Sequence, residues 1–308
     1  RNNLKLIGLG LANYESANKD LPAAGLVAPS DDPSMFAPNF DPRSGQQLSW
    51  MVLLLPYIEE PALYEQFDLS RSVFEQDLNP QSQFVGTYHC PSDAAPGRVF
   101  NTPITNGKDL AKANYAAYVS PQHVGDLQYI IGALGGFKPG SIHGQRLRRV
   151  KDGTSKTIAV TEVLTRDDER DARGMWAVPW GAASVLAAHI DHDFDGTGTS
   201  REDQRSVRHY VPDPAFYEWV HLPNTQKTND LLYACPSPVQ AAVDGLPCSR
   251  GSGRGRLFVT GAPRSRHQGG VNINSLDGHV GFLADDVDPV LFVQIVSVHD
   301  TAVTQALQ

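Results

Sequence analysis

The sequence has few long apolar runs and little positive charge. Its longest uninterrupted apolar run, Trp50–Leu55, has six residues, whereas a membrane-spanning helix needs about 20. Lys and Arg number 26 against 34 Asp and Glu, which gives a formal net charge of −8. Nucleic acids and anionic membranes favour partners with a positive face. We therefore expect no nucleic-acid partner, and contact with a membrane only through a segment that precedes Arg1.

Cysteine is scarce as well, with only Cys90, Cys235 and Cys248 in the chain. Cys235 and Cys248 are thirteen residues apart and enclose a proline-containing loop, which a disulfide could close with a gain of about 3 kcal/mol. The alternative is a pair of reduced thiols in an intracellular protein. Cys90 then either stays unpaired or pairs with a cysteine that precedes Arg1.

Sequence motifs of known enzyme classes are absent. The chain has no G-x-S-x-G elbow, no H-E-x-x-H, no phosphate-binding loop and no paired zinc cysteines. Catalytic triads assemble in space, so a missing motif does not disprove catalysis. We nevertheless expect that the protein is not an enzyme.

A length of 308 residues corresponds to one large domain or two, and we expect one elaborated domain over residues 1–308. Residues 1–22 are predicted to begin with a helix that ends before Pro22, because apolar residues recur at helical spacing at Leu4, Ile7, Leu11 and Tyr14. Residues 23–180 and 257–308 are expected to form the core, and residues 181–256 a large loop-rich insertion.

The clearest local pattern is a hairpin near the C-terminus. Asp277-Gly278 separates two apolar segments, which predicts a two-residue type I′ turn. Pairing Leu276 with His279 places four residues on one buried face: Val271, Ile273, Val280 and Phe282. A last helix is expected after Asp288-Pro289. Further strands are predicted at Phe84–His89, Tyr115–Val119, Thr157–Val163 and Leu257–Thr260.

Several short motifs follow one another along the chain. They are Asn2-Asn3-Leu4-Lys5-x-Ile7-Gly8, Asn13-Tyr14, Leu21-Pro22, Leu53-Leu54-Leu55-Pro56-Tyr57-Ile58-Glu59, Cys90-Pro91-Ser92-Asp93, Asn114-Tyr115, Asp152-Gly153-Thr154-Ser155-Lys156-Thr157-Ile158, Pro223-Asn224 and Arg266-His267. Nine residues separate His267 from Asp277-Gly278. Together these motifs resemble the bacterial prepilin-type proteins that carry the H-x9-DG domain, a family of unknown function.

The resemblance implies a pilin-like α+β fold, in which a long N-terminal helix packs on an antiparallel β-sheet. It implies an exported, cell-surface structural or assembly protein that associates with itself or with other pilin-like subunits through that helix. The leader and hydrophobic segment of such proteins would precede Arg1, so we expect a processed or trimmed chain. Family members commonly have a cysteine just before the Asn-Asn-Leu-Lys motif, which could pair with Cys90. The family also carries an extracellular solute-binding label, which is the alternative function.

The roles of the family motif residues His267, Asp277 and Gly278 stay open. Asp277 and Gly278 suit the turn itself. For His267 we favour a hydrogen bond that fixes the hairpin over catalysis or metal binding.

The strongest chemical motif is a calcium loop in residues 191–202, Asp-His-Asp-Phe-Asp-Gly-Thr-Gly-Thr-Ser-Arg-Glu. It matches D-x-D-x-D-G-x5-E, because Ca²⁺ prefers six to eight oxygen ligands and a bidentate glutamate at the twelfth position. Gly198 replaces the aliphatic residue of paired loops, so we expect an isolated structural Ca²⁺ site with a Kd of about 10⁻⁴–10⁻³ M. The predicted ligands are Asp191, Asp193, Asp195, Thr197, Thr199 and Glu202.

Aromatic residues concentrate beside this loop, with seven of the chain's 26 in residues 176–219. They could form a platform for a glycan or another solute, with Trp176, Trp180, Tyr217 and Trp219 as the candidate residues. The alternative is a small satellite core under the insertion, which we favour.

Overall fold

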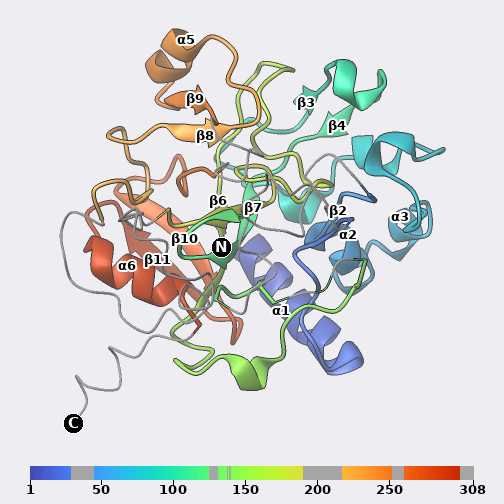
Figure 1. Cartoon of the computed structure of the whole chain (residues 1–308), viewed down its shortest axis with the longest axis horizontal. Helices are drawn as coiled ribbons and strands as arrows, with labels where there is room; N and C mark the ends of the chain where they lie inside the picture. The colour runs from blue at the N-terminus through green and yellow to red at the C-terminus, as the bar shows by residue number, and fades with distance from the viewer. Residues whose placement is uncertain are drawn as a thin grey trace, which may run out of the picture.

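A computed structural model describes residues 1–28, 45–124, 131–136, 138, 140–189, 217–251 and 260–298. Within these ranges the fold mixes helices with several sheets, and a five-stranded sheet forms the centre (Figure 1). The strand order of this sheet is β11-β10-β6-β5-β7. Its strands are β5 (Tyr115–Ser120), β6 (Ile158–Glu162), β7 (Val185–Ala187), β10 (Gly270–Ser275) and β11 (Val280–Ala284).

The first helix, α1 (Asn2–Asn18), packs against β10 of the central sheet. Its predicted apolar stripe is confirmed, because all four residues are buried: Leu4, Ile7, Leu11 and Tyr14. Gly8 allows the close approach, since a Cβ atom at this position would lie 2.5 Å from the Asn274 side chain on β10. The helix ends at Asn18, and Lys19 follows in the left-handed conformation with φ 66°.

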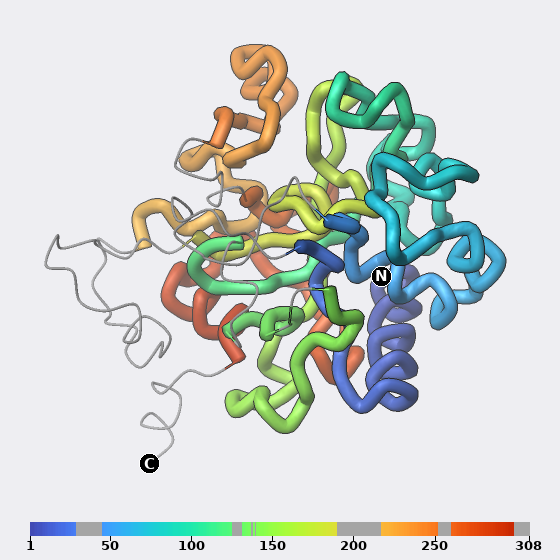
Figure 2. The backbone as a smooth tube through the Cα atoms, turned by 45° about the vertical axis from the view of Figure 1, so that its right-hand side comes forward, coloured from blue at the N-terminus to red at the C-terminus, as the bar shows by residue number. Residues whose placement is uncertain are grey.

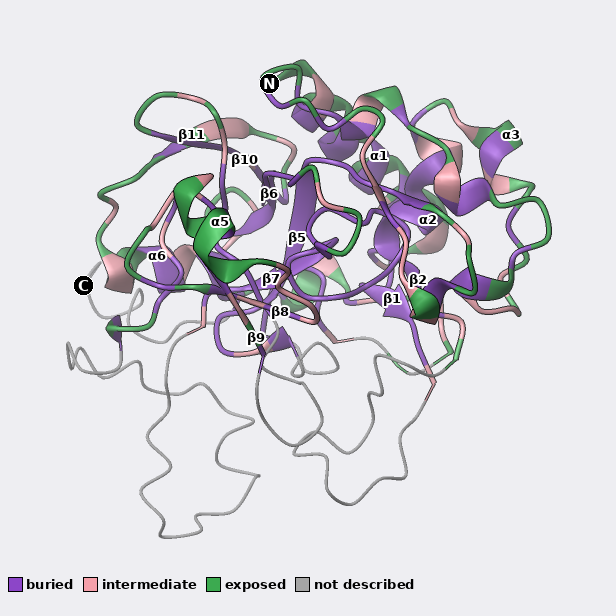
Figure 3. Ribbon diagram, turned by 90° about the horizontal axis from the view of Figure 1, so that it is seen from above, coloured by how far each residue is buried: buried purple, intermediate pink, exposed green. Residues whose placement is uncertain are grey.

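Helices cover both faces of the sheet. Neighbouring residues of β5 point to opposite faces: Ala117 belongs to the main core with the α1 residues, and Tyr118 belongs to a second core. Tyr118 contacts Phe292 of α6 (Pro289–Val296), with ring centroids 6.0 Å apart. The buried strands therefore lie between α1 and α6 (Figure 3). The predicted start of α6 is confirmed, because Asp288 Oδ1 accepts a hydrogen bond from the Leu291 N–H at 2.9 Å.

The central sheet is mixed, so the expectation of an antiparallel sheet is wrong at one edge. β7 pairs in parallel with β5, whereas the other neighbouring strands are antiparallel. Parallel neighbours need a long connection, and β6 with its flanking loops separates β5 from β7 in sequence. β7 also lies inside residues 181–256, the range predicted as a loop-rich insertion, so the chain leaves the sheet only after Ala187.

The hairpin of β10 and β11 forms, but with another turn and register than predicted. The Gly278 N–H donates to Ser275 O, and the Ser275 N–H donates to His279 O. The turn therefore has three loop residues, 276–278. Among them only Gly278 has a positive φ, +85°. Val280 consequently lies opposite Asn274 and packs on the α1 side, while Ile273 packs in the second core. Phe282 is 44% exposed and Leu283 is buried in its place.

Two of the other predicted strands are confirmed, at β5 and β6. The predicted strand Phe84–His89 is wrong, because Gly86–Tyr88 forms a 3₁₀ helix. Tyr88 is buried, and its hydroxyl donates to Met51 O at 2.7 Å, so tertiary packing overrides the alternating pattern. In the predicted strand Leu257–Thr260, only Thr260 belongs to the described residues.

Short elements surround the central layers. The short helices are α2 (Trp50–Leu54), α3 (Pro61–Tyr64) and α5 (Pro238–Val243). The paired short strands are β1 (Gly25–Leu26) with β2 (Leu48–Ser49), β3 (Val99–Phe100) with β4 (Leu110–Ala111), and β8 (Asp230–Leu232) with β9 (Cys248–Arg250). Among the described helices, none combines the length and apolar character needed to cross a membrane.

A small unit of α5, β8 and β9 projects at the opposite end of the molecule from α1 (Figure 2). The predicted disulfide is confirmed here, with Cys235 bonded to Cys248 and their Cα atoms 5.8 Å apart. This bond closes the loop that contains α5 onto the start of β9. The unit is therefore stabilised by a covalent bond as well as by its small apolar cluster.

Candidate functional site

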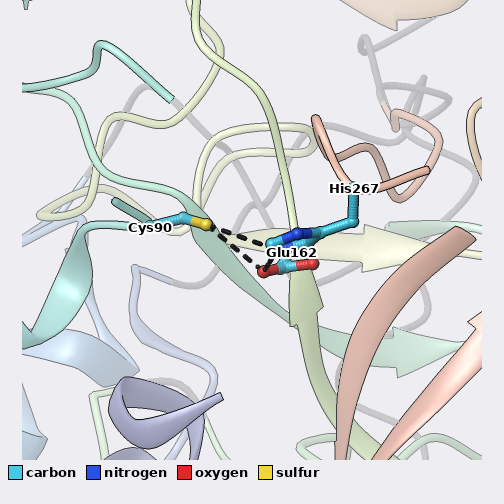
Figure 4. Close-up of side chains that lie close together, drawn as sticks. All are labelled: Cys90, Glu162 and His267. Carbon is cyan, nitrogen blue, oxygen red and sulfur yellow. Dashed lines mark hydrogen bonds and ion pairs between the residues drawn. The ribbon is translucent and has the colours of Figure 1, made fainter. Parts of the chain in front are cut away.

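Three side chains from distant parts of the sequence meet where β6 ends. Glu162 is the last residue of β6, Cys90 follows the 3₁₀ helix Gly86–Tyr88, and His267 lies in the loop before β10 (Figure 4). Glu162 Oε1 lies 3.1 Å from His267 Nε2 and 3.4 Å from Cys90 Sγ. The sulfur and the imidazole nitrogen are 3.7 Å apart. A thiol, a carboxylate and an imidazole therefore converge on one point.

Strand pairing positions the carboxylate of Glu162. β10 pairs with β6 so that Ile273 lies opposite Thr161, which brings Asn272 beside Glu162. The Asn272 backbone N–H donates to Oε2 at 2.7 Å, and its Nδ2 lies 3.2 Å from both carboxylate oxygens. Arg1 Nε donates to Asn272 Oδ1 at 3.0 Å, so the first residue of the described chain helps to orient this amide. Glu162 itself is 1% exposed.

Asn114 holds the backbone of Cys90 beside the end of β6. Its backbone N–H donates to Asn114 Oδ1 at 2.9 Å, and Asn114 Nδ2 donates to Asp93 Oδ2 at 2.8 Å and to Val163 O at 3.1 Å. Asn114 thus joins the Cys-Pro-Ser-Asp turn to the end of β6. Burial and the nearby Glu162 carboxylate raise the pKa of the Cys90 thiol, although hydrogen bonds from Ser92 act in the opposite direction. The protonated thiol is a weak nucleophile.

The Ser265 hydroxyl and a main-chain hydrogen bond to β6 fix the loop that carries His267. The His267 backbone N–H donates to Ser265 Oγ at 3.0 Å, and Ser265 Oγ donates to Gly270 O at 2.7 Å. The Arg264 N–H donates to Glu162 O at 2.8 Å, which ties the loop directly to β6. The His267 side chain is 31% exposed, in contrast to Glu162. One side of the cluster is therefore open to solvent.

The structure gives the family motif residues different roles. We predicted that the His267 side chain fixes the hairpin, but its Nε2 instead contacts Glu162 on the neighbouring strand. Asp277 stays in the turn, where Oδ1 accepts a hydrogen bond from the His279 N–H at 2.9 Å. Gly278 provides the left-handed residue of the same turn. Asp277 and Gly278 thus have a sufficient structural explanation.

The four candidate residues of the aromatic platform do not form one surface. Trp176, Trp180 and Tyr217 are at most 6% exposed, whereas Trp219 is 52% exposed. The two buried tryptophans belong to the main core and Tyr217 to the second core. Trp176 Nε1 donates to Gln83 O and Trp180 Nε1 donates to Gln47 Oε1, so their polar atoms are also satisfied inside the protein. The platform alternative is therefore wrong for these three rings, which fill the interior. The favoured satellite core is also wrong for the two tryptophans, because they pack in the main core.

The predicted calcium loop lies outside the described residues. This applies to all six predicted ligands: Asp191, Asp193, Asp195, Thr197, Thr199 and Glu202.

Sequence reasoning did not single out Glu162 as a site residue. It ends a buried strand, and a carboxylate there would be costly without a partner. That cost was the available signal, but the partners lie 72 and 105 residues away in sequence. For Cys90 the sequence offers only its place in the Cys-Pro-Ser-Asp motif and two alternatives, an unpaired thiol or a bond to a cysteine that precedes Arg1.

Comparison with known proteins places the chain in a family without supplying an activity. Neither a curated protein nor a solved structure matches the chain. A family model described as "Protein of unknown function (DUF1559)" matches residues 1–290. Because this match covers nearly all of the 308 residues, the chain belongs to the DUF1559 family.

Proposed function

We propose that this protein is an exported structural or assembly subunit of the pilin-like kind, located at the cell surface or outside the cell. In this role it associates with itself or with other pilin-like subunits through α1. The ordered motifs that end in His267 and Asp277-Gly278 support the proposal, since they resemble prepilin-type proteins with the H-x9-DG domain. The Cys235–Cys248 disulfide also supports export, because such bonds persist mainly in oxidising compartments.

The observation that carries the proposal is the distribution of apolar residues around α1. One side of the helix is buried against the protein, and a separate pair, Leu6 and Leu9, is 47% and 57% exposed. Leu6 and Leu9 are three residues apart and so lie next to each other on the helix surface. A helix that packs on its own sheet and also presents leucines outward is suited to contact a neighbouring subunit.

The calcium loop predicted at residues 191–202 belongs to this proposal as a structural site. Extracellular Ca²⁺ is abundant enough for a site with a Kd of about 10⁻⁴–10⁻³ M. Calcium would hold the insertion in one conformation and would not act as a switch.

Electron microscopy of the full-length, processed protein tests the assembly role. We expect filaments or envelope-associated assemblies from the wild type, and their loss when Leu9→Lys places a charge on the exposed side of α1. The matched control is Ser16→Lys, which adds the same charge at another exposed position of the same helix. Assemblies that survive Leu9→Lys, or a wild-type protein that stays monomeric and free of the envelope, would count against the proposal.

A further inference from the structure

The Cys90–Glu162–His267 cluster has the dimensions of a metal site. Zinc binds sulfur at about 2.3 Å, imidazole nitrogen at about 2.0–2.1 Å and carboxylate oxygen at about 2.0–2.2 Å. In a tetrahedral complex such ligand atoms are separated from one another by about 3.3–3.6 Å. The corresponding separations here are 3.1, 3.4 and 3.7 Å. One ion could therefore contact all three atoms with shifts of a few tenths of an ångström.

The charges of the three groups also suit a divalent cation. Among the described residues, His267 is the ion-pair partner of the buried Glu162 carboxylate. A buried carboxylate is costly unless a charge and hydrogen bonds compensate it. A thiolate, a carboxylate, a neutral imidazole and one divalent cation together have no net charge. When the ion binds, the sulfur–hydrogen bond is replaced by a sulfur–metal bond and the proton passes to solvent.

Surrounding hydrogen bonds hold the prospective ligands in place. Asn272 binds Oε2 of Glu162 through its backbone N–H, and Oε1, which also accepts from Asn272 Nδ2, lies within 3.4 Å of the sulfur and the imidazole nitrogen. Asn114 fixes the backbone of Cys90. Such outer contacts orient metal ligands and typically contribute about 10–100-fold in affinity.

We propose that Cys90, Glu162 and His267 bind one divalent transition-metal ion, Zn²⁺ being the expected occupant. Sulfur, nitrogen and oxygen ligands in tetrahedral arrangement are the set that zinc prefers. Because the His267 side chain is partly exposed, water would have access to a fourth coordination position. Three protein ligands with one open position distinguish this site from closed structural zinc sites, which have four. The site is independent of the proposed pilin-like role.

Cobalt provides a direct test, because Co²⁺ replaces Zn²⁺ and reports its ligands in the absorption spectrum. With Cys235 and Cys248 bonded, Cys90 is the sole thiol of the three cysteines. Among these three cysteines, a thiolate-to-cobalt charge-transfer band can therefore arise only at Cys90, even if Co²⁺ also occupies the calcium loop. We expect one equivalent of Co²⁺ to produce this band, together with strong tetrahedral d–d bands, and Zn²⁺ to abolish both.

Variants identify the other two ligands. Cys90→Ser should abolish the charge-transfer band, and Glu162→Gln and His267→Gln should weaken Co²⁺ binding by more than 100-fold. Asn272→Ala should weaken it by about 10–100-fold. The matched control is His143→Gln, a histidine on the surface whose side chain is 48% exposed and faces Asp20, and it should bind like the wild type. Circular dichroism confirms that each variant is folded.

Three results would overturn the proposal. The first is the absence of the charge-transfer band in folded wild type whose Cys90 thiol has been confirmed by titration. The second is persistence of the band in both Glu162→Gln and His267→Gln. The third is a disulfide at Cys90 in the protein isolated from cells. The first and third measurements use the wild type, so they do not depend on whether a variant folds.

Discussion

His267 Nε2 lies 3.1 Å from Glu162 Oε1, although the two residues are 105 positions apart in sequence. The contact joins the loop before β10 to the last residue of β6, next to the backbone hydrogen bond from Arg264 to Glu162. Because Glu162 is buried and also accepts hydrogen bonds from Asn272, one carboxylate connects the two strands and the loop. This convergence has consequences for stability that do not depend on a bound metal.

Replacing Glu162 should show how much its acceptor oxygens contribute. Glu162→Ala leaves the donors of Asn272 without their acceptor, and we expect the free energy of unfolding to fall by about 3 kcal/mol. Glu162→Gln keeps an acceptor for Asn272 and should lose less. Urea denaturation of metal-free protein measures both values. Equal losses in the two variants would show that the charge, and not hydrogen bonding, stabilises this position.

A buried ion-pair network beside the site should be equally sensitive. Asp230 binds Arg264 at 2.9 Å and Arg173 at 3.2 Å, and all three side chains are at most 2% exposed. Burial would raise the pKa of Asp230, but the two guanidinium groups lower it overall. Asp230→Ala leaves two buried cations without their shared partner, so we expect a loss of about 3–5 kcal/mol.

An exposed ion pair is the control for that prediction. Asp77→Ala removes the partner of Arg71, where the side chains are 78% and 40% exposed. Exposed pairs contribute about 0–1 kcal/mol, so this variant should denature at nearly the wild-type urea concentration. A small loss in Asp230→Ala, similar to that of the control, would contradict the importance of the buried network.

His221 should make the protein less stable in acid. Burial, together with nearby His189, lowers the pKa of His221 from 6.5 to about 3. The unfolded chain therefore binds a proton below about pH 6.5 that the folded protein does not bind until about pH 3. The free energy of unfolding therefore does not depend on this histidine's titration above about pH 6.5. Between about pH 6.5 and pH 3 it falls by about 1.4 kcal/mol for each unit that the pH is lowered. His221→Gln should reduce the slope of unfolding free energy against pH by that amount, and an unchanged slope would contradict the prediction.

Calcium should stabilise the protein through residues 191–202. With a Kd of about 10⁻⁴–10⁻³ M, about 10 mM Ca²⁺ adds about 1.4–2.7 kcal/mol to the free energy of unfolding. We expect chelation to lower the melting temperature and Ca²⁺ to restore it in the wild type and in Cys90→Ser, but not in Glu202→Gln. Zn²⁺, in contrast, should restore the melting temperature in the wild type and in Glu202→Gln, but not in Cys90→Ser. A melting temperature that does not respond to Ca²⁺ would exclude the structural calcium site.

Local patterns predicted the elements whose formation depends on neighbouring residues. The buried stripe of α1 follows from residue spacing, and the start of α6 follows from Asp288 and Pro289. The predicted register of the hairpin was wrong because Asp-Gly suits both a two-residue turn and a three-residue turn with a left-handed glycine. Packing against the two cores decided between them, with Leu283 buried and Phe282 exposed. Aromatic density likewise predicted packing near residues 176–219 without showing which rings face inward.

Residue spacing was enough to predict the first helix, two of the central strands and the Cys235–Cys248 disulfide, and the ordered motifs indicated a family of unknown function, which the match over residues 1–290 confirms. Only the tertiary structure brought Cys90, Glu162 and His267 together, because their proximity depends on the β6–β10 pairing and on turns held by Asn114 and Ser265. Hydrogen-bonding patterns within a helix or turn act over a few residues and can be recognised in the sequence. Contacts over 72 to 177 residues require the complete fold, and the scarcity of cysteine made Cys90 noticeable without showing what lies beside it.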